Sequence, residues 1–230
     1  MLESLRAEVL EANLELVHRG LVIYTFGNAS GISRERGLVA IKPSGVPYET
    51  MTAADMVIAD LEGRIVEGSL KPSSDLATHV ALYRAFPSIG GVVHTHSRHA
   101  TAWAQAGREI PCFGTTHADY FHGAVPVTDP LTPEEIRSEY EANTGVAIVR
   151  TMQGRDALAC PAVLVAGHAP FCWGKSAAEA AHTAVIVEEL AAMAIETLAI
   201  NPAARPISQA LRDKHHFRKH GPNATYGQKA

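Results

Sequence analysis

The sequence of 230 residues contains few aromatic side chains, few charges and little excess of either sign. Aromatic residues make up 6% and charged residues 19% of the chain, and the net charge is −4, so the basic surface of a nucleic-acid-binding protein is missing. No run of about 18 apolar residues occurs, which argues against a membrane span. The chain begins with an amphipathic, acid-containing pattern that does not resemble a signal peptide. We therefore expect neither a nucleic-acid partner nor a membrane anchor.

Cysteine is also scarce. Cys112, Cys160 and Cys172 are an odd number and lack the Cys-x-x-Cys spacing, which predicts reduced thiols in a cytoplasmic protein. The glycine motifs of dinucleotide and phosphate-loop folds are absent, so nucleotide-binding folds gain no support. Apolar residues are abundant: they make up 47% of the chain, which is enough to build a hydrophobic core without disulfides. No repeat or linker divides the sequence, and we expect one domain over residues 1–230.

Hydrophobic periodicity and capping residues predict alternating helices and short strands. Helices are expected at the N-terminus up to Gly20 and at residues 75–86, 97–107, 132–152, 176–200 and 207–221, with strands at 21–26, 37–43, 90–96, 162–168 and 170–174. GNASG, residues 27–31, is expected to be a turn, and a hairpin is expected around Glu62–Gly63. This order predicts an α/β fold with a mixed or antiparallel sheet between helical layers.

Twelve histidines are the most unusual feature of the composition. His94 and His96 are two residues apart near the end of an expected strand, where their side chains share one face, and His168 ends another strand. Three imidazoles with one open position are typical of a catalytic zinc site, and Asp75 is a candidate fourth ligand. Spacing alone leaves open a chance motif or a hydrogen-bonded pair in the core.

Two short motifs are candidates for anion binding. Lys42-Pro-Ser44-Gly45 follows an expected strand, and Lys71-Pro-Ser73-Ser74 opens an expected helix. Hydroxyls, a glycine amide and a helix N-terminus together favour a phosphate, although ordinary turns and caps have the same residues.

Two polar segments lie further along the chain. Residues 114–123 include Thr115 and Asp119 in a polar loop, and polar side chains of this kind are costly in a core but useful in a site. His215 and Arg218 lie on the last expected helix, with Tyr226 beyond it; a basic helix end that stabilises the helix dipole is the alternative explanation.

Several blocks of the sequence resemble the epimerase branch of the class II aldolase and epimerase family. They are GNASG, KPSGVPYETMTAADMV, KPSSD, FPSIGGVVHTHSRHATAWAQAG, GTTHADYFHG, GHAPFCWGK and DKHHFRKHG, in order from about Met1 to Gln228. The resemblance implies a three-layer α/β/α domain with a central, largely antiparallel sheet. It also implies a cyclic homotetramer with active sites shared between subunits, and a tail, residues 221–230, that reaches a neighbouring subunit.

The resemblance further implies roles for particular residues. It assigns His94, His96 and His168, with Asp75, to one Zn²⁺ per subunit, for which Mn²⁺ or Co²⁺ could substitute. It places Asn28, Lys42, Ser44, Gly45, Ser73 and Ser74 around a substrate phosphate. It makes Asp119 and Tyr226 the acid and base donated by a neighbouring subunit, supported by His215 and Arg218, and puts Thr115 and Glu141 at or near the site.

The implied reaction interconverts L-ribulose 5-phosphate and D-xylulose 5-phosphate by cleaving and re-forming the C3–C4 bond. The main alternative is an aldolase of the same family, of the L-fuculose-phosphate type, which releases an aldehyde from a sugar phosphate. Asp75, where those aldolases have Glu, and the Asp119–Tyr120 pair favour the epimerase. A non-catalytic member, like the head of a cytoskeletal adaptor, is expected to lack metal ligands, whereas all three histidines are present here.

Overall fold

The computed structural model of the chain describes residues 2–220 and 224–225. Its strands form one seven-stranded sheet in the order β4-β3-β2-β1-β5-β7-β6, and every pair of neighbours is antiparallel. The strands are β1 (Asn28–Ser33), β2 (Leu38–Ile41), β3 (Val57–Asp60), β4 (Ile65–Glu67), β5 (Gly91–His94), β6 (Ala162–Leu164) and β7 (Pro170–Gly174). The predicted antiparallel sheet is confirmed.

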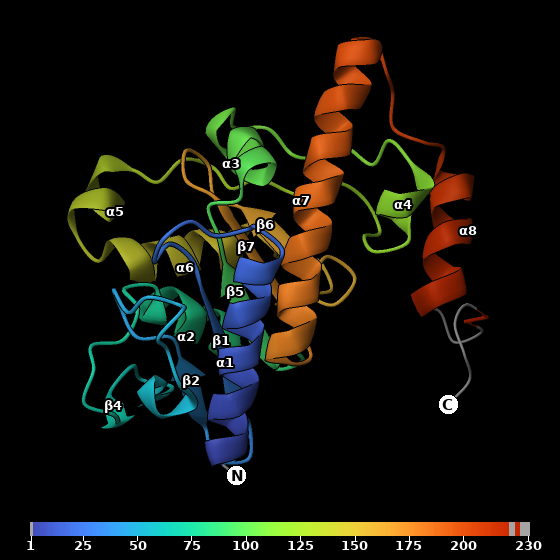
Figure 1. The fold of residues 1–230 in the computed structure, drawn as a ribbon. Helices are drawn as coiled ribbons and strands as arrows, with labels where there is room; N and C mark the ends of the chain where they lie inside the picture. The colour runs from blue at the N-terminus through green and yellow to red at the C-terminus, as the bar shows by residue number, and fades with distance from the viewer. Residues whose placement is uncertain (1, 221–223, 226–230) are drawn as a thin grey trace.

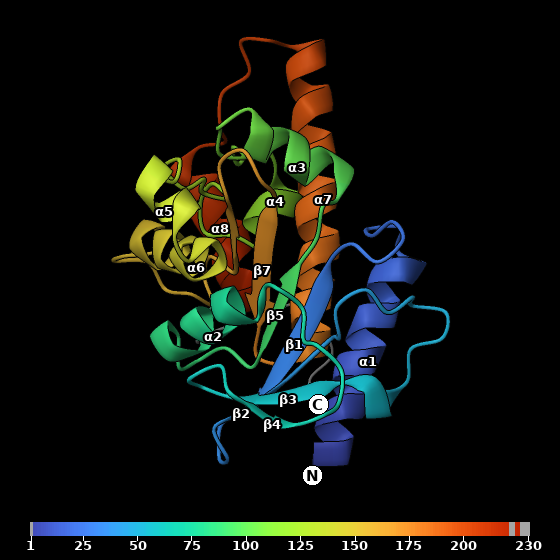
Figure 2. The ribbon, with the colours of Figure 1, turned by 90° about the vertical axis from the view of Figure 1, so that its left-hand side faces the viewer.

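Helices cover both faces of this sheet (Figures 1 and 2). They are α1 (Leu2–His18), η1 (Ala53–Asp55), α2 (Leu76–Ala85), α3 (Arg98–Gln105), α4 (Thr115–Ala118), α5 (Pro133–Arg137), α6 (Tyr140–Thr151), α7 (Ala177–Ile200) and α8 (Gln209–His220). In Figure 2 the strands lie between α2 and α6 on one side and α1 and α7 on the other. The predicted three-layer α/β/α architecture is therefore confirmed.

The two layers are fixed by apolar faces of their helices. On α1, Leu5, Val9, Ala12 and Leu16 are buried at helical spacing, and α1 packs on β1 and α7. On the opposite side, Leu76 and Val80 of α2 cluster with Ile41, Val57 and Ala59 of the sheet. Removing these apolar side chains from water is the main favourable term that holds the layers together.

The first strand is not where the sequence predicts it. Residues 21–26 form a loop, in which Leu21 is buried and Tyr24 is 85% exposed at φ 55°. Residues 28–31 of the expected turn belong instead to β1. Gly31 explains part of this, because a Cβ there would lie 3.0 Å from Val9 and 3.1 Å from Leu5 of α1. The small residues of β1 let α1 approach the sheet closely, which sequence periodicity does not register.

Other predicted boundaries also differ. The helix expected at 132–152 is broken into α5 and α6 around Ser138, where the Asn143 side chain donates hydrogen bonds to the Glu135 carbonyl and to Ser138 Oγ. β5 ends at His94 and β6 ends at Leu164, so His96 and His168 lie in loops just beyond their strands. Within residues 2–220 and 224–225, no helix combines the length and the apolar character needed to span a membrane.

Candidate active site

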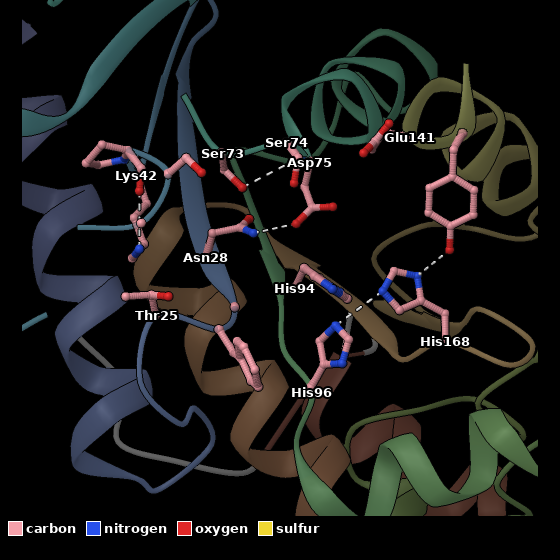
Figure 3. Close-up of a pocket in the computed structure, with 16 residues that line it drawn as sticks. Thr25, Asn28, Lys42, Ser73, Ser74, Asp75, His94, His96, Glu141 and His168 are labelled. Carbon is pink, nitrogen blue, oxygen red and sulfur yellow. Dashed lines mark hydrogen bonds between the residues drawn. The ribbon is translucent and has the colours of Figure 1, made fainter. Parts of the chain in front are cut away.

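The three predicted metal ligands meet at one end of the sheet (Figure 3). One ring nitrogen from each of His94, His96 and His168 lies within 4.8 Å of the other two. The Nε2 atoms of His96 and His168 are 3.2 Å apart, and each pair of ring centroids is separated by 4.9 to 5.0 Å. The end of β5, the loop directly after it, and a loop 72 residues further along the chain thus point three imidazoles at one small volume.

Hydrogen bonds orient two of these rings. His94 Nδ1 donates a hydrogen bond to the Pro170 carbonyl at 3.0 Å, so the lone pair on its Nε2 is available to bind a metal. The same ring stacks on Phe171, with the ring centroids 4.2 Å apart. Tyr140 Oη lies 3.1 Å from His168 Nδ1. Partners on the remote nitrogen are the usual way in which a protein fixes the tautomer of a metal-binding histidine.

The electrostatics of the group suit a cation. Burial lowers the pKa of His94 to about 3, and it also lowers the pKa of His96 and His168, so all three imidazoles are neutral at pH 7. Neutral imidazoles offer lone pairs, and three nitrogen donors facing one point suit zinc and other divalent transition metals. The donor set therefore fits the predicted metal.

Glu188 of α7 forms hydrogen bonds with the segment that follows His96. The Glu188 carboxylate accepts hydrogen bonds from the backbone N–H groups of His99, at 2.9 Å, and Ala100, at 3.0 Å, and from the His99 ring at 2.8 Å. Backbone N–H groups at the start of a helix have no partner within that helix, so an acidic side chain there stabilises its first turn. Glu188 thereby anchors the start of α3, directly after His96.

The histidines form one wall of a cavity of about 490 Å³. The described residues that line it are Thr25, Phe26, Gly27, Asn28, Lys42, Pro43, Ser44, Gly45, Ser73, Ser74, Asp75, His94, His96, Tyr140, Glu141 and His168. One cavity is thus lined by all three histidines, by Asp75 and Glu141, and by the six predicted phosphate-binding residues. Sequence reasoning missed Thr25, Phe26 and Tyr140, because nothing in a lone threonine or aromatic residue indicates a site.

The two anion-binding motifs are joined in space. Ser44 N donates to the Lys71 carbonyl at 2.9 Å, Ser73 N donates to the Lys42 carbonyl at 3.0 Å, and Pro43 and Pro72 form an antiparallel bridge. Gly45 follows with φ +71°, a left-handed backbone that favours glycine. The pairing places both sets of serine hydroxyls at the same end of the cavity.

Lys42 brings a buried positive charge to this end of the cavity. Its side chain is 2% exposed, and Nζ donates to the carbonyls of Pro43 and Val46 and lies 4.7 Å from the centre of the Tyr48 ring. Burial lowers the pKa of this ammonium, and in the described part of the chain no carboxylate pairs with it. A buried cation without a carboxylate partner is costly, and a bound phosphate would stabilise it.

Asp75 lies beside the histidines but is held by another residue. Its Oδ2 accepts a hydrogen bond from Asn28 Nδ2 at 2.7 Å, and the close histidine group among the described residues does not include it. Burial by itself raises the pKa of Asp75. Electrostatic interactions with His94 and His79, together with the Asn28 hydrogen bond, outweigh this effect, and the pKa is lowered overall. The carboxylate is therefore ionised at neutral pH. Its role as a metal ligand stays a prediction.

A second polar cluster lies outside the cavity. Asp119 accepts hydrogen bonds from Arg218 at 2.9 Å and His215 at 3.1 Å, and Lys219 Nζ is 3.6 Å away. Burial raises the pKa of Asp119, but the bonds from Arg218 and His215 outweigh it and lower the pKa. In Figure 1 the helices concerned, α4 and α8, lie on the opposite side of α7 from α2 and α6.

The structure thus separates the predicted site residues into two groups. Four of them are not among the described residues that line the cavity: Thr115, Asp119, His215 and Arg218. The predicted association of Asp119 with His215 and Arg218 of the same chain is present. Tyr226 and most of the tail at 221–230 lie outside the described residues.

Tyr140 gives the first testable prediction. We expect Tyr140→Phe to weaken binding of a divalent metal by about 10- to 100-fold, because His168 loses the hydroxyl that orients its ring. Competition with a chromophoric chelator measures the affinity directly. Tyr24→Phe is the matched control, since that ring is 85% exposed, and it should bind metal normally. Equal affinities for the two variants would show that Tyr140 does not orient the ligand.

Comparison with known proteins agrees with this geometry. The family described as Class II Aldolase and Adducin N-terminal domain matches residues 7–195. Among curated proteins, L-ribulose-5-phosphate 4-epimerase UlaF of Salmonella paratyphi C (strain RKS4594) is 57% identical over 228 residues, covering 99% of this chain and 100% of the relative. The protein of the same name from Salmonella paratyphi A (strain ATCC 9150 / SARB42) is 56% identical with the same coverage.

Solved structures show the same fold. An L-fuculose 1-phosphate aldolase superposes with a TM-score of 0.77 at 27% identity, covering 92% of this chain and 94% of the other. YgbL of Klebsiella pneumoniae, described as a putative aldolase/epimerase/decarboxylase, superposes with a TM-score of 0.74 at 26% identity, covering 94% and 99%. The sequence match, the sheet topology and the histidine group agree, and the chain belongs to the class II aldolase family.

Proposed function

We propose that this protein is a metal-dependent epimerase that interconverts L-ribulose 5-phosphate and D-xylulose 5-phosphate. The observation that carries the proposal is a single cavity with three neutral imidazoles on one wall and a buried ammonium with serine hydroxyls at another. Such a cavity suits a phosphorylated sugar whose carbonyl end faces a metal. The identity of 57% to proteins named L-ribulose-5-phosphate 4-epimerase supports this substrate.

The chemistry follows from the position of the stereocentre. C4 of the sugar is not adjacent to the C2 carbonyl, so its hydrogen is not acidic and direct deprotonation is unfavourable. Breaking the C3–C4 bond instead gives an enediolate and glycolaldehyde phosphate, and re-addition to the other face of the aldehyde inverts C4. A divalent cation held by His94, His96 and His168, proposed to be zinc with manganese or cobalt as substitutes, would polarise the sugar carbonyl as a Lewis acid.

The protein residues have two further tasks in this reaction. Lys42, with the hydroxyls and amides of the paired Ser44 and Ser73 segments, holds the phosphate, so that the aldehyde fragment rotates without escaping. A base must also take the proton of the C4 hydroxyl, and an acid must return one after the new bond forms. We assign these roles to Asp119 and Tyr226.

Asp119 can serve this cavity only from another copy of the chain, because it lies in the separate cluster with Arg218. We therefore propose a cyclic homotetramer in which each active site takes its metal ligands from one subunit and Asp119 and Tyr226 from the next. One heterologous contact repeated around a ring gives such an assembly. A cytoplasmic location is proposed as well, supported by three cysteines that are all buried free thiols.

The phosphate assignment predicts the effect of Lys42→Met. Loss of the ammonium removes a hydrogen bond to a charged acceptor, worth about 1.5 to 3 kcal/mol, so KM should rise by roughly 10- to 100-fold. Steady-state kinetics with L-ribulose 5-phosphate measure this change, and released glycolaldehyde phosphate should increase because the fragment is held less firmly. Lys175→Met, which changes an exposed lysine outside the cavity, is the control. An unchanged KM in Lys42→Met would place the phosphate elsewhere.

The function itself is tested with purified protein and L-ribulose 5-phosphate. We expect D-xylulose 5-phosphate to form, to stop forming after exhaustive chelation, and to form again when zinc is restored. L-fuculose 1-phosphate is offered in parallel. Cleavage of that sugar phosphate without epimerisation of the first would identify the protein as an aldolase, and turnover of neither would refute the proposal.

A further inference from the structure

Tyr48 is a buried tyrosine to which the proposed reaction assigns no role. Its side chain is 3% exposed, and it is not among the described residues that line the cavity. Burial raises the pKa of its phenol, so the hydroxyl keeps its proton at neutral pH and remains a hydrogen-bond donor. Two parts of the cavity nevertheless meet this side chain, one at its ring and one at its hydroxyl.

The ring of Tyr48 lies beneath the Lys42 ammonium. Nζ is 4.7 Å from the ring centre, and it donates hydrogen bonds to the Pro43 carbonyl at 3.2 Å and to the Val46 carbonyl at 3.3 Å. The face of an aromatic ring attracts a cation, most strongly where water is excluded. An ammonium has three protons, so one remains for a ligand in the cavity. The ring therefore helps to hold Nζ where a phosphate can bind it.

The hydroxyl of the same side chain is bonded to the loop at residues 21–27. Tyr48 Oη donates to the carbonyls of Phe26 and Gly27, both at 3.0 Å, so one proton is shared by two acceptors. Phe26 and Gly27 both line the cavity. Residues 21–27 belong to no helix or strand, so a bond from a buried side chain restricts backbone that no ladder of hydrogen bonds holds.

This loop also packs on the segment that carries two of the metal-binding histidines. A Cβ at Gly27 would lie 2.9 Å from the His94 carbonyl oxygen, which shows that the two backbones are in close contact. The ring centroids of Phe26 and His96 are 6.2 Å apart. The position of the loop is therefore tied to the position of the histidines.

We propose that Tyr48 is a positioning residue that sets the distance between the phosphate-binding end of the cavity and the metal-binding histidines. Its ring holds the Lys42 ammonium, and its hydroxyl holds the loop that packs against His94. In Figure 3, Lys42 and His168 lie at opposite sides of the cavity. The inference rests on the proposed function, in which the C5 phosphate binds at one end and the C2 carbonyl faces the other. The C3–C4 bond lies between them, so a change in their separation misplaces it.

Two variants separate the ring from the hydroxyl. Tyr48→Phe keeps the ring beside Lys42 and loses both hydrogen bonds to the loop, whereas Tyr48→Leu loses the ring as well. We expect Tyr48→Phe to bind inorganic phosphate as the wild type does, and Tyr48→Leu to bind it about 5- to 30-fold more weakly, because the ammonium loses the aromatic face. Isothermal titration calorimetry measures both affinities. Equal weakening in the two variants, or in neither, would contradict the role of the ring.

Loss of the hydroxyl should affect turnover rather than binding. We expect kcat of Tyr48→Phe for L-ribulose 5-phosphate to fall by about 10-fold or more, with KM and zinc affinity within about 2-fold of the wild type, because small errors in the placement of reacting atoms are costly. A general loss of stability would not produce this split. An unchanged kcat, or a KM that rises in parallel with the fall in kcat, would overturn the proposal.

Tyr83→Phe is the matched control. Tyr83 is another buried tyrosine, 0% exposed, and its hydroxyl lies 2.8 Å from Ser30 Oγ. It is not among the described residues that line the cavity. We expect this variant to lower the melting temperature to an extent similar to Tyr48→Phe and to keep its kcat. A similar fall in kcat would show that the loss of any buried tyrosine hydroxyl has this effect, and would contradict a positioning role for Tyr48.

A measurement on the wild-type protein keeps the proposal testable if a variant does not fold. A tyrosine hydroxyl proton that is hydrogen-bonded away from water exchanges slowly, and NMR of protein labelled with carbon-13 at tyrosine Cζ detects this exchange. The signal of Tyr48 is assigned through its contact with the Lys42 side chain. We expect slow exchange at Tyr48 and fast exchange at Tyr24, which is 85% exposed. Fast exchange at Tyr48 would overturn the proposal.

The outcomes distinguish this inference from the proposed function. If the wild-type protein fails to epimerise L-ribulose 5-phosphate, the proposed function is wrong. The phosphate titrations and the hydroxyl exchange do not depend on turnover, so they would still decide whether Tyr48 holds Lys42 and the loop in place.

Discussion

Replacement of His96 by alanine should abolish turnover and leave the fold intact. His96 is one of three nitrogen donors, and without it the metal site keeps only two imidazoles. Lewis-acid stabilisation by a bound cation is worth several kcal/mol, so we expect turnover to fall on the order of 1,000-fold or more. His96 is exposed and lies outside any strand or helix, so its removal creates no cavity in the core.

The measurement has three parts: turnover, metal content per subunit by elemental analysis, and the melting temperature. We expect about one metal per subunit in the wild type, as for an open catalytic site, and a large loss in His96→Ala with little change in melting temperature. His18→Ala is the matched control, because His18 is exposed at the end of α1. Full activity of His96→Ala after exhaustive chelation would refute the metal mechanism.

A mixture of two inactive variants should recover about a quarter of the activity. His96→Ala lacks a metal ligand, and Asp119→Asn lacks one of the two proposed acid/base groups but should keep its metal, because Asp119 is not among the described residues that line the cavity. If each site draws His96 from one subunit and Asp119 from the next, random assembly of equal amounts makes about one site in four complete. The experiment unfolds the two proteins, mixes them, refolds them and measures turnover.

The cluster around Asp119 requires its own control. Asp119→Asn removes ion pairs to α8 as well as a proposed acid/base group, so it could act by loosening that helix. Asp213→Asn removes the negative charge from another contact of α8, the 2.7 Å hydrogen bond with His122, and should leave most of the turnover. A mixture that stays inactive, although mass analysis shows that subunits have exchanged, would place Asp119 and His96 of each site in the same chain.

Much of the site could be predicted from single motifs. His-x-His at the end of an apolar run, and a third histidine after another run, are local patterns, and a strand end directs side chains in a way that its sequence reveals. The structure brings these three imidazoles within 4.8 Å of one another. The two Lys-Pro-Ser motifs were equally visible, although each alone reads as an ordinary turn or cap.

The tertiary structure decided what these motifs become together. Pairing of the segments around Pro43 and Pro72 joins the two serine motifs, and the packing of α2 on β1 brings Asp75 to Asn28 and His79 to Ser30. GNASG has the composition of a turn, yet its last four residues begin the central strand β1. Its polar side chains find partners on α2, and its glycine admits α1 at close range. The hydrogen-bonding groups of this segment are paired with residues far away in sequence, and local propensity does not predict such pairings.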